Sequence, residues 1–168
     1  MSNKIKGVFA IIFSQDKQKI VMVKRRDFPL WVIPGGGIDV GETPEDACIR
    51  EVFEETGLKC RIVRKITEHH QKALFKIASA LFECEIISGE LALTEETKQA
   101  AFFRINSLPT PLLPLFREFI DTALMNTPPR EAKLEALSLK SMIKFLILHP
   151  VISIRFLLTK LGLHINTK

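Results

Sequence analysis

The chain has 168 residues, of which 46% are apolar and 26% charged, and its mean hydropathy is +0.15. This length and composition suit one folded domain with an appendage and exclude a largely disordered chain. Residues 1–125 carry 17 basic and 17 acidic side chains, whereas residues 126–168 carry seven and two, so the net charge of +5 lies in the C-terminal segment. No basic surface of the kind that a dedicated nucleic-acid-binding domain needs is therefore expected on residues 1–125.

The cysteines and the N-terminus indicate a reducing compartment. Cys48, Cys60 and Cys84 are odd in number, irregularly spaced and free of any C-x-x-C motif, so they predict neither a disulfide framework nor a zinc site. The N-terminal run GVFAIIF is short and has no small-residue cleavage site after it, so it predicts a first strand and not a signal peptide. A cytoplasmic protein is the expectation.

Apolar runs predict the first strands. GVFAIIFS and KIVMVKR are rich in β-branched residues and are separated by the polar turn QDKQ, which predicts a β-hairpin. The short run LWVI predicts another strand, which leads directly into Pro34 and three consecutive glycines.

A helix is predicted from Pro44 to Thr56. Thr43 suits the N-cap, Pro44 suits the first helical position, and Gly57 suits the residue just beyond the C-terminal end. The signals at both ends are local, so the predicted bounds do not depend on the rest of the chain.

Three further strands are predicted downstream, in the runs CRIVRKI, ALFKIASALFECEII and AAFFRI. The polar segment SGELALTEETKQ predicts a loop before the last of them. The segment LPTPLLPLFREFIDTALM predicts a turn and a second helix, with Thr110 as its cap. Strands interleaved with helices predict an α/β fold, in which helices pack on a mixed sheet.

Residues 126–168 are predicted to form a C-terminal helical extension that follows the helix-breaking segment NTPPRE. The extension is basic and apolar, and it is interrupted at His149-Pro150. Its internal charges argue against insertion across a bilayer. We expect its helices to pack on residues 1–125 or on a second subunit of a homodimer, and contact with an anionic membrane surface or a partner protein is the alternative.

The predicted helix 44–56 gathers acidic side chains on one face. At about 100° per residue, Glu51, Glu54 and Glu55 share roughly a third of the circumference with Ala47. The opposite face, expected to pack on the sheet, consists of Cys48, Ile49, Val52 and Phe53. A solvated acidic face is the ordinary alternative, but it does not account for the glycines that precede the cap.

Clustered carboxylates repel one another, so a positive group is expected beside them. Carboxylate oxygens are hard ligands that suit Mg²⁺ or Mn²⁺. The glycine run at 35–37 allows the backbone to approach an ion closely, so that a peptide carbonyl can serve as a further ligand. The residues themselves therefore predict a divalent metal site on this helix.

The spacing of these residues resembles a family signature. Five residues separate Gly36 from Glu42, seven more separate Glu42 from Arg50, and Arg50 begins the segment REVFEETGL. This pattern is similar to the complete Nudix box, G-x5-E-x7-R-E-U-x-E-E-x-G-U, where U is apolar. The flanking segments WVIPGG and AAFFRINSLP also resemble the family, so the resemblance covers residues 5–125.

Resemblance to the Nudix family implies a Nudix-type α/β/α sandwich and metal-dependent hydrolysis of a nucleoside diphosphate linked to another group. The metal ligands that it implies are Glu51, Glu54, Glu55 and the carbonyl of Gly36. It also implies that Arg50 orients a neighbouring carboxylate and that Glu42 supports the metal site. Mg²⁺ or Mn²⁺ would clamp phosphate oxygens and acidify water.

Further site residues are expected outside the box. Many family members take another acid from a loop, for which Glu95 and Glu96 are the candidates, although Gln99 stands where an acid often precedes the aromatic strand. A solvated loop is the alternative for Glu96. The candidates for substrate contact are Arg25 and Arg26 for phosphate, and Phe28 and Trp31 for base stacking. Core packing is the alternative role for Trp31, and a solvated strand end is the alternative for the two arginines.

The expected function is therefore cleavage of a diphosphate bond in a nucleotide-type small molecule. Markers of several Nudix subfamilies are absent, since the chain has no tyrosine and no proline between Pro44 and Pro109, and the substrate is not selected. The alternative is a Nudix-like binding or regulatory module whose basic C-terminal helices engage a membrane surface, nucleic acid or a protein.

Overall fold

A computed structural model describes most of the first 125 residues and part of the C-terminal extension. The described ranges are 4–26, 30–71, 77–92, 94–95, 97–110, 112–125, 130–131 and 138–150. The strands are β1 (Gly7–Ile12), β2 (Lys19–Arg25), β3 (Trp31–Val32), β4 (Gly35–Gly37), β5 (Lys59–Gln71), β6 (Ile77–Ser88), β7 (Thr97–Arg104) and β8 (Arg130–Glu131). The helices are α1 (Pro44–Thr56), α2 (Pro114–Leu124) and α3 (Leu139–Leu148).

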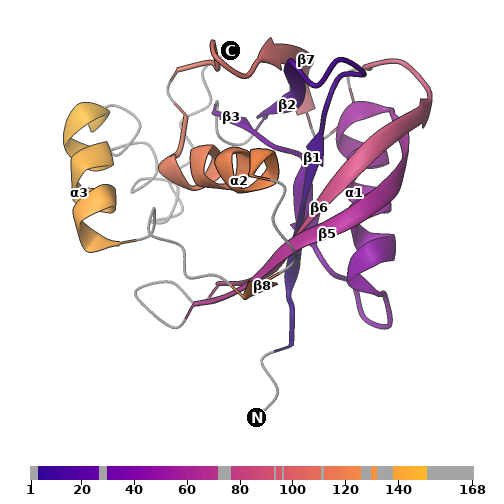
Figure 1. Ribbon diagram of the computed structural model, residues 1–168, viewed down its shortest axis with the longest axis horizontal. Coiled ribbons are helices and arrows are strands. Elements are labelled where there is room, and N and C mark those ends of the chain that lie inside the picture. The colour runs from indigo at the N-terminus through magenta and orange to yellow at the C-terminus, as the bar shows by residue number, and fades with distance from the viewer. Residues whose placement is uncertain are drawn as a thin grey trace.

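The strands form two sheets between α1 and α2 (Figure 1). The larger sheet has the order β4-β1-β6-β5-β8, and the smaller sheet has the order β3-β2-β7. β1 is antiparallel to β4 and parallel to β6. The predicted α/β/α sandwich with a mixed sheet is therefore confirmed.

β1 and β2 do not form the predicted hairpin. A tight turn does join them, because the amide of Ser14 donates to the carbonyl of Lys19 at 2.8 Å, and a single bridge joins Phe13 and Ile20. Beyond that bridge the strands diverge, and β1 enters the larger sheet while β2 enters the smaller one. The hairpin prediction was wrong because both strands take their main partners from distant parts of the chain.

Two apolar clusters hold the layers together, and β1 contributes to both because its side chains alternate between its faces. The cluster beside α1 includes Val8, Ala10, Ile12, Ala47, Cys48 and Val52. The cluster beside α2 includes Phe9, Ile11, Phe116, Phe119 and Ile120. β1 is therefore the strand against which both helices are anchored.

α1 has the predicted bounds, Pro44 to Thr56. The side chain of Thr43 accepts a hydrogen bond from the amide of Asp46 at 3.1 Å, and Gly57 ends the helix with a left-handed φ of 76°. These contacts satisfy backbone groups that a helix end leaves unpaired. The local end signals were sufficient to place this helix.

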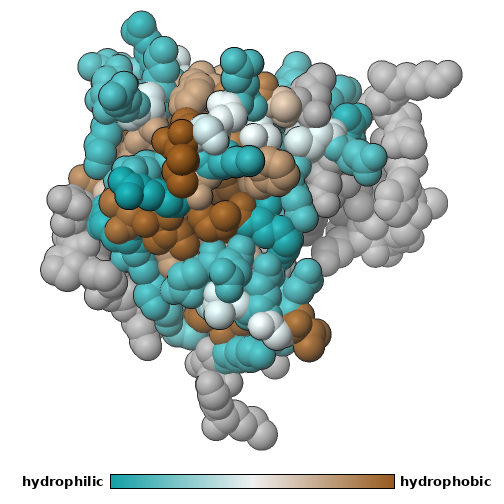
Figure 2. Space-filling view, turned by 90° about the vertical axis from the view of Figure 1, so that its right-hand side faces the viewer, coloured by the Kyte–Doolittle hydropathy of each residue, from teal (hydrophilic) through white to brown (hydrophobic). Residues whose placement is uncertain are grey.

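One residue on the expected packing face of α1 does not pack. Cys48 and Val52 are buried as predicted, but Phe53 is 50% exposed. Ala47 and the acidic residues Glu51 and Glu55 are buried instead, and both carboxylates meet the backbone of β4. Figure 2 views the side of the molecule on which α1 lies and shows apolar side chains at the surface among hydrophilic ones.

The elements after α1 depart from the predictions mainly at their ends. β7 begins at Thr97, inside the expected loop, and α2 begins at Pro114 with Leu113 as its N-cap, so the prediction of Thr110 as the cap was wrong. The short strand β8 was not predicted, and it pairs in parallel with β5. No helix in the part of the chain that the structure describes is long and apolar enough to cross a membrane.

Replacement of Gly57 by Ala is expected to lower the free energy of unfolding by about 1–2 kcal/mol, because a side chain is strained at positive φ. The added Cβ would also lie 3.1 Å from the Cβ of Ala92. Urea unfolding followed by circular dichroism measures the effect. Gly37→Ala is the control, since its Cβ would meet no atom within 4 Å, and equal losses in both variants would contradict the explanation.

Candidate active site

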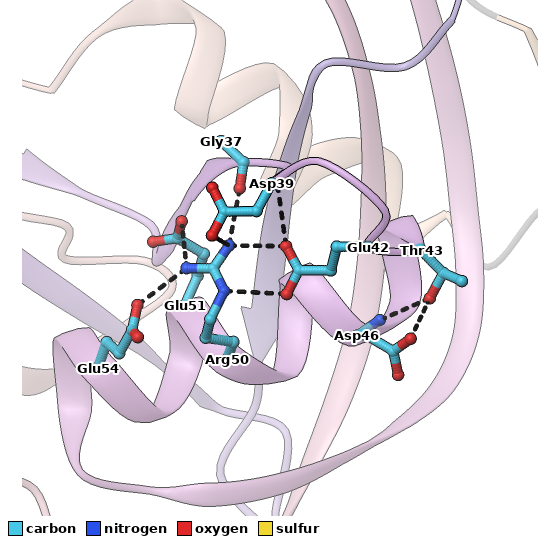
Figure 3. A network of polar contacts seen from close by, with 8 residues as sticks. All are labelled: Gly37, Asp39, Glu42, Thr43, Asp46, Arg50, Glu51 and Glu54. Carbon is cyan, nitrogen blue, oxygen red and sulfur yellow. Dashed lines mark hydrogen bonds and ion pairs between the residues drawn. The ribbon is translucent and has the colours of Figure 1, made fainter.

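Arg50, in the middle of α1, is the centre of a polar network (Figure 3). Its guanidinium donates to both carboxylate oxygens of Glu42, from Nε and from Nη2, at 2.9 Å each. Nη1 donates to Glu51 at 3.0 Å and to Glu54 at 2.9 Å, and Nη2 donates to the carbonyl of Gly37 at 3.0 Å. One side chain thus connects α1 to β4 and to the turn that precedes the helix.

The network fixes the charge of its members. The hydrogen bonds from Arg50 hold the pKa of the Glu42 carboxyl below its ordinary value, with help from the amide of Asp39. The same contacts raise the pKa of Arg50, first through Glu42 and then through Glu54 and Glu51, against an opposing effect of burial. Bidentate, charge-assisted contacts of this kind are short and directional. Both partners therefore stay ionised at neutral pH.

Glu51 lies directly against the backbone of β4. A Cβ added to Gly36 would lie 2.4 Å from the nearest carboxylate oxygen of Glu51, so any side chain at position 36 would displace that carboxylate. Glu51 is only 8% exposed. Close approach of the helix carboxylate to the peptide chain is the physical reason for glycine at this position.

Glu55 meets the same strand one residue earlier. Its Oε2 accepts a hydrogen bond from the amide of Gly35 at 2.9 Å, and its Oε1 lies 3.9 Å from Nη1 of Arg25 at the end of β2. Glu55 is 2% exposed. Two buried carboxylates, one helical turn apart, therefore converge on the Gly35–Gly36 segment.

Glu54 completes the acidic face but is more accessible, since its side chain is 42% exposed and is held by Arg50. Among the described residues, no three His, Cys, Asp or Glu side chains are arranged to hold a metal ion. Arg50 supplies the positive charge beside Glu51 and Glu54 in this arrangement. The donor set of carboxylates next to a glycine backbone nevertheless fits a hard divalent cation in its chemistry.

The first residue of β7 contacts the C-terminal end of α1, and the loop before β7 contacts Arg26. The hydroxyl of Thr97 donates to the carbonyl of Glu55 at 2.9 Å, and Nη2 of Arg26 donates to the carbonyl of Thr94 at 3.0 Å. Arg25 and Arg26 thus lie next to the acidic helix and its neighbouring loop. Glu96, the candidate acid of this loop, lies outside the described residues.

Trp31 belongs to the edge of the core. Its ring packs on Phe103 at a centroid distance of 4.6 Å in an edge-on arrangement, and Lys24 Nζ lies 5.9 Å from the centroid of the Trp31 ring. The indole is half-buried next to the α2 cluster. This placement fits the packing role, and Phe28, the other stacking candidate, lies outside the described residues.

The sequence did not reveal several members of this site. The Gly35 amide, the Gly37 carbonyl and the hydroxyl of Thr97 are all partners of box residues. The run of glycines was a signal for close backbone approach, but it could not say which carboxylate meets which peptide group. Nothing in the sequence marked Thr97.

Comparison with known proteins identifies the family. The family model of the NUDIX domain matches residues 4–123, which is most of the chain. The chain belongs to the Nudix family.

Relatives include proteins named for cleavage of diphosphate bonds. An ADP-ribose pyrophosphatase of Methanocaldococcus jannaschii is 34% identical over 97 residues, which are 54% of this chain and 57% of the relative. A Bacillus subtilis protein, provisionally named an 8-oxo-dGTP diphosphatase, is 39% identical over 94 residues, or 56% of this chain and 61% of the relative. The chain therefore spans about three fifths of the length of these two curated relatives.

Solved structures support the fold. The crystal structure of an ADP-ribose pyrophosphatase from Streptococcus suis matches with a TM-score of 0.62 and 25% identity, over 75% of this chain and 97% of that one. The match covers almost all of that protein, so the rest of this chain lies outside the shared architecture.

Replacement of Arg50 by Gln is expected to raise the pKa of Glu42 toward its ordinary value, because the guanidinium is the main cause of its depression. NMR titration of the side-chain carboxyl carbons measures this change. Asp16 is the control, since its pKa is lowered by Ser14 and the amide of Gln18, remote from Arg50. An unchanged Glu42 pKa in the variant would contradict the assignment.

The lowered pKa of Glu42 also makes the free energy of unfolding depend on pH. A carboxyl whose native pKa is depressed stabilises the fold above its unfolded pKa, and the contribution disappears as the pH falls through the native value. The difference in free energy of unfolding between wild type and Arg50→Gln should therefore narrow as the solution is made acidic. A difference that widens on acidification would contradict this prediction.

Proposed function

We propose that the chain hydrolyses a diphosphate bond in a nucleotide or nucleoside diphosphate derivative, with Mg²⁺ or Mn²⁺ held by α1. The observation that carries the proposal is the convergence of the buried carboxylates of Glu51 and Glu55 on the backbone at Gly35 and Gly36. Like charges are brought out of water at a helix face that has a hard-ligand donor set. A purely structural helix has no need of such an arrangement.

The residues that would hold the metal are Glu51, Glu54, Glu55 and the carbonyl of Gly36. When bound, a divalent ion neutralises charge on phosphate oxygens and makes water a better nucleophile at neutral pH. Arg50 orients Glu51 and Glu54 through its two Nη1 hydrogen bonds. Glu42 in turn fixes the plane of the guanidinium.

The arginines at the end of β2 would bind the substrate phosphates. Arg25 lies beside Glu55 on the acidic face of α1, and Arg26 donates to the carbonyl of Thr94 in the loop before β7. A guanidinium is suited to phosphate because its planar fork pairs two oxygens at once. In-line attack of water at phosphorus then needs positioning and charge stabilisation more than covalent help from the protein.

Assignments beyond the described residues complete the proposal. Glu96 is the candidate to contact the metal or its bound water, and Phe28 is the remaining candidate for base stacking. The class of substrate is supported by the names of relatives, which include ADP-ribose pyrophosphatase and RNA pyrophosphohydrolase. Both names denote cleavage of a diphosphate bond in a molecule that contains a nucleotide.

Glu54→Gln and Glu55→Gln are each expected to lower kcat by at least about tenfold, because each removes one carboxylate charge from the site. The assay measures product release with Mg²⁺ or Mn²⁺ from nucleoside triphosphates, ADP-ribose, nucleotide sugars, dinucleoside polyphosphates and 5′-triphosphorylated RNA. Glu45→Gln is the matched control, since Glu45 is an exposed acid on the same helix.

Two results would overturn the proposal. If none of these substrates is cleaved with either metal, the chain is a binding or regulatory module and not a hydrolase of this class. If cleavage occurs but Glu54→Gln and Glu55→Gln both turn over like Glu45→Gln, the site is elsewhere.

A further inference from the structure

α3 carries an apolar and basic face that the hydrolytic function does not use. Lys140, Ile143, Lys144, Ile147 and Leu148 follow the spacing i, i+3, i+4, i+7 and i+8, so they lie along one side of the helix. Together they line a shallow surface depression. Three of these side chains are apolar and two are positively charged.

This face is open to solvent. Ile147 is 72% exposed, Leu148 is 61% exposed and Ile143 is 46% exposed. Among the described residues, only side chains of α3 line the depression. Contiguous exposed apolar groups with charged neighbours indicate a binding surface more often than chance exposure does.

The charge of the segment favours an anionic partner. Residues 126–168 carry the entire net charge of +5, and residues 1–125 are neutral overall. A second copy of the chain would bring another segment of the same charge against the first, because a two-fold contact joins identical surfaces. Self-association through this face is therefore opposed by repulsion.

We propose that α3 docks on an anionic lipid surface. A helix face that mixes lysines with apolar side chains can lie in the plane of the membrane interface, where the apolar side chains enter the headgroup region and the lysines pair with anionic headgroups. At about 100° per residue, Lys140 and Lys144 lie in the middle of this face, with Ile143 and Ile147 on one side of them and Leu148 on the other.

The position of α3 allows docking without obstruction of the hydrolytic site. In Figure 1, α3 and α1 lie at opposite sides of the molecule, with α2 and the sheets between them. The acidic face of α1 thus stays accessible when α3 lies on a membrane. The proposal is independent of the hydrolytic activity, since it involves no residue of that site.

The test is co-sedimentation of the full chain with vesicles of phosphatidylcholine alone and of phosphatidylcholine mixed with phosphatidylglycerol. Retention is expected only on the mixed vesicles, and it should fall at high salt. Lys140→Glu combined with Lys144→Glu should weaken retention by at least about tenfold. Ile143→Ser combined with Ile147→Ser should also weaken it, because less apolar surface enters the interface.

Matched variants separate this surface from general charge and hydrophobicity. Lys19→Glu with Lys59→Glu changes the net charge equally at exposed positions of β2 and β5, and Val63→Ser with Ile87→Ser removes exposed apolar groups elsewhere. Both should retain binding. Circular dichroism and thermal unfolding show that each variant is folded.

Three outcomes would overturn the proposal. The first is equal sedimentation of the wild type with both vesicle types, or none with either. The second is the same loss of binding in the control variants as in the α3 variants. The third is a dimer in sedimentation equilibrium that Ile143→Ser with Ile147→Ser dissociates, which would assign the face to a second copy.

Discussion

The rest of the site depends on the hydrogen bonds that the guanidinium of Arg50 donates. α1 presents Glu51, Glu54 and Glu55 within two turns, and such carboxylates repel one another in an isolated helix. Arg50 lies among them and adds Glu42 and the Gly37 carbonyl to the same network. Arg50 therefore offsets the repulsion among the carboxylates. It also joins α1 to β4, because its N–H groups donate to residues of both elements.

The sandwich supplies the second constraint, since it brings the glycine strand to the helix. β4 reaches α1 because it pairs with β1, which is also the strand that packs under α1. Gly36 then lies closer to Glu51 than any side chain would allow, and the amide of Gly35 donates to Glu55. Two neighbouring buried carboxylates are unfavourable on their own, and the fold holds them in place through these backbone contacts.

Sequence reasoning succeeded where the causes are local and failed where they are distant. The bounds of α1 followed from Thr43, Pro44 and Gly57, which act within one turn of the helix ends. The hairpin of β1 and β2 was wrong because sheet partners are chosen by tertiary packing. Phe53 was misplaced because the α1 side chains that are buried include Glu51 and Glu55, which meet the β4 backbone. Helical periodicity predicted the acidic face, and the resemblance to the Nudix box implied the role of Arg50. The contacts of the Gly35 amide and Thr97 depend on strands that only folding brings together.

The proposed metal site between α1 and β4 can be tested without a substrate. An NMR titration with Mn²⁺ tests it most directly, because the paramagnetic ion broadens the signals of nuclei close to it, whatever the substrate. We expect the amide signals of Gly35, Gly36, Glu51 and Glu55 to broaden first, at low metal-to-protein ratios, while the amide signals of α3 stay sharp. Uniform broadening across the protein, or broadening that begins at other acidic residues such as Asp16, would contradict it.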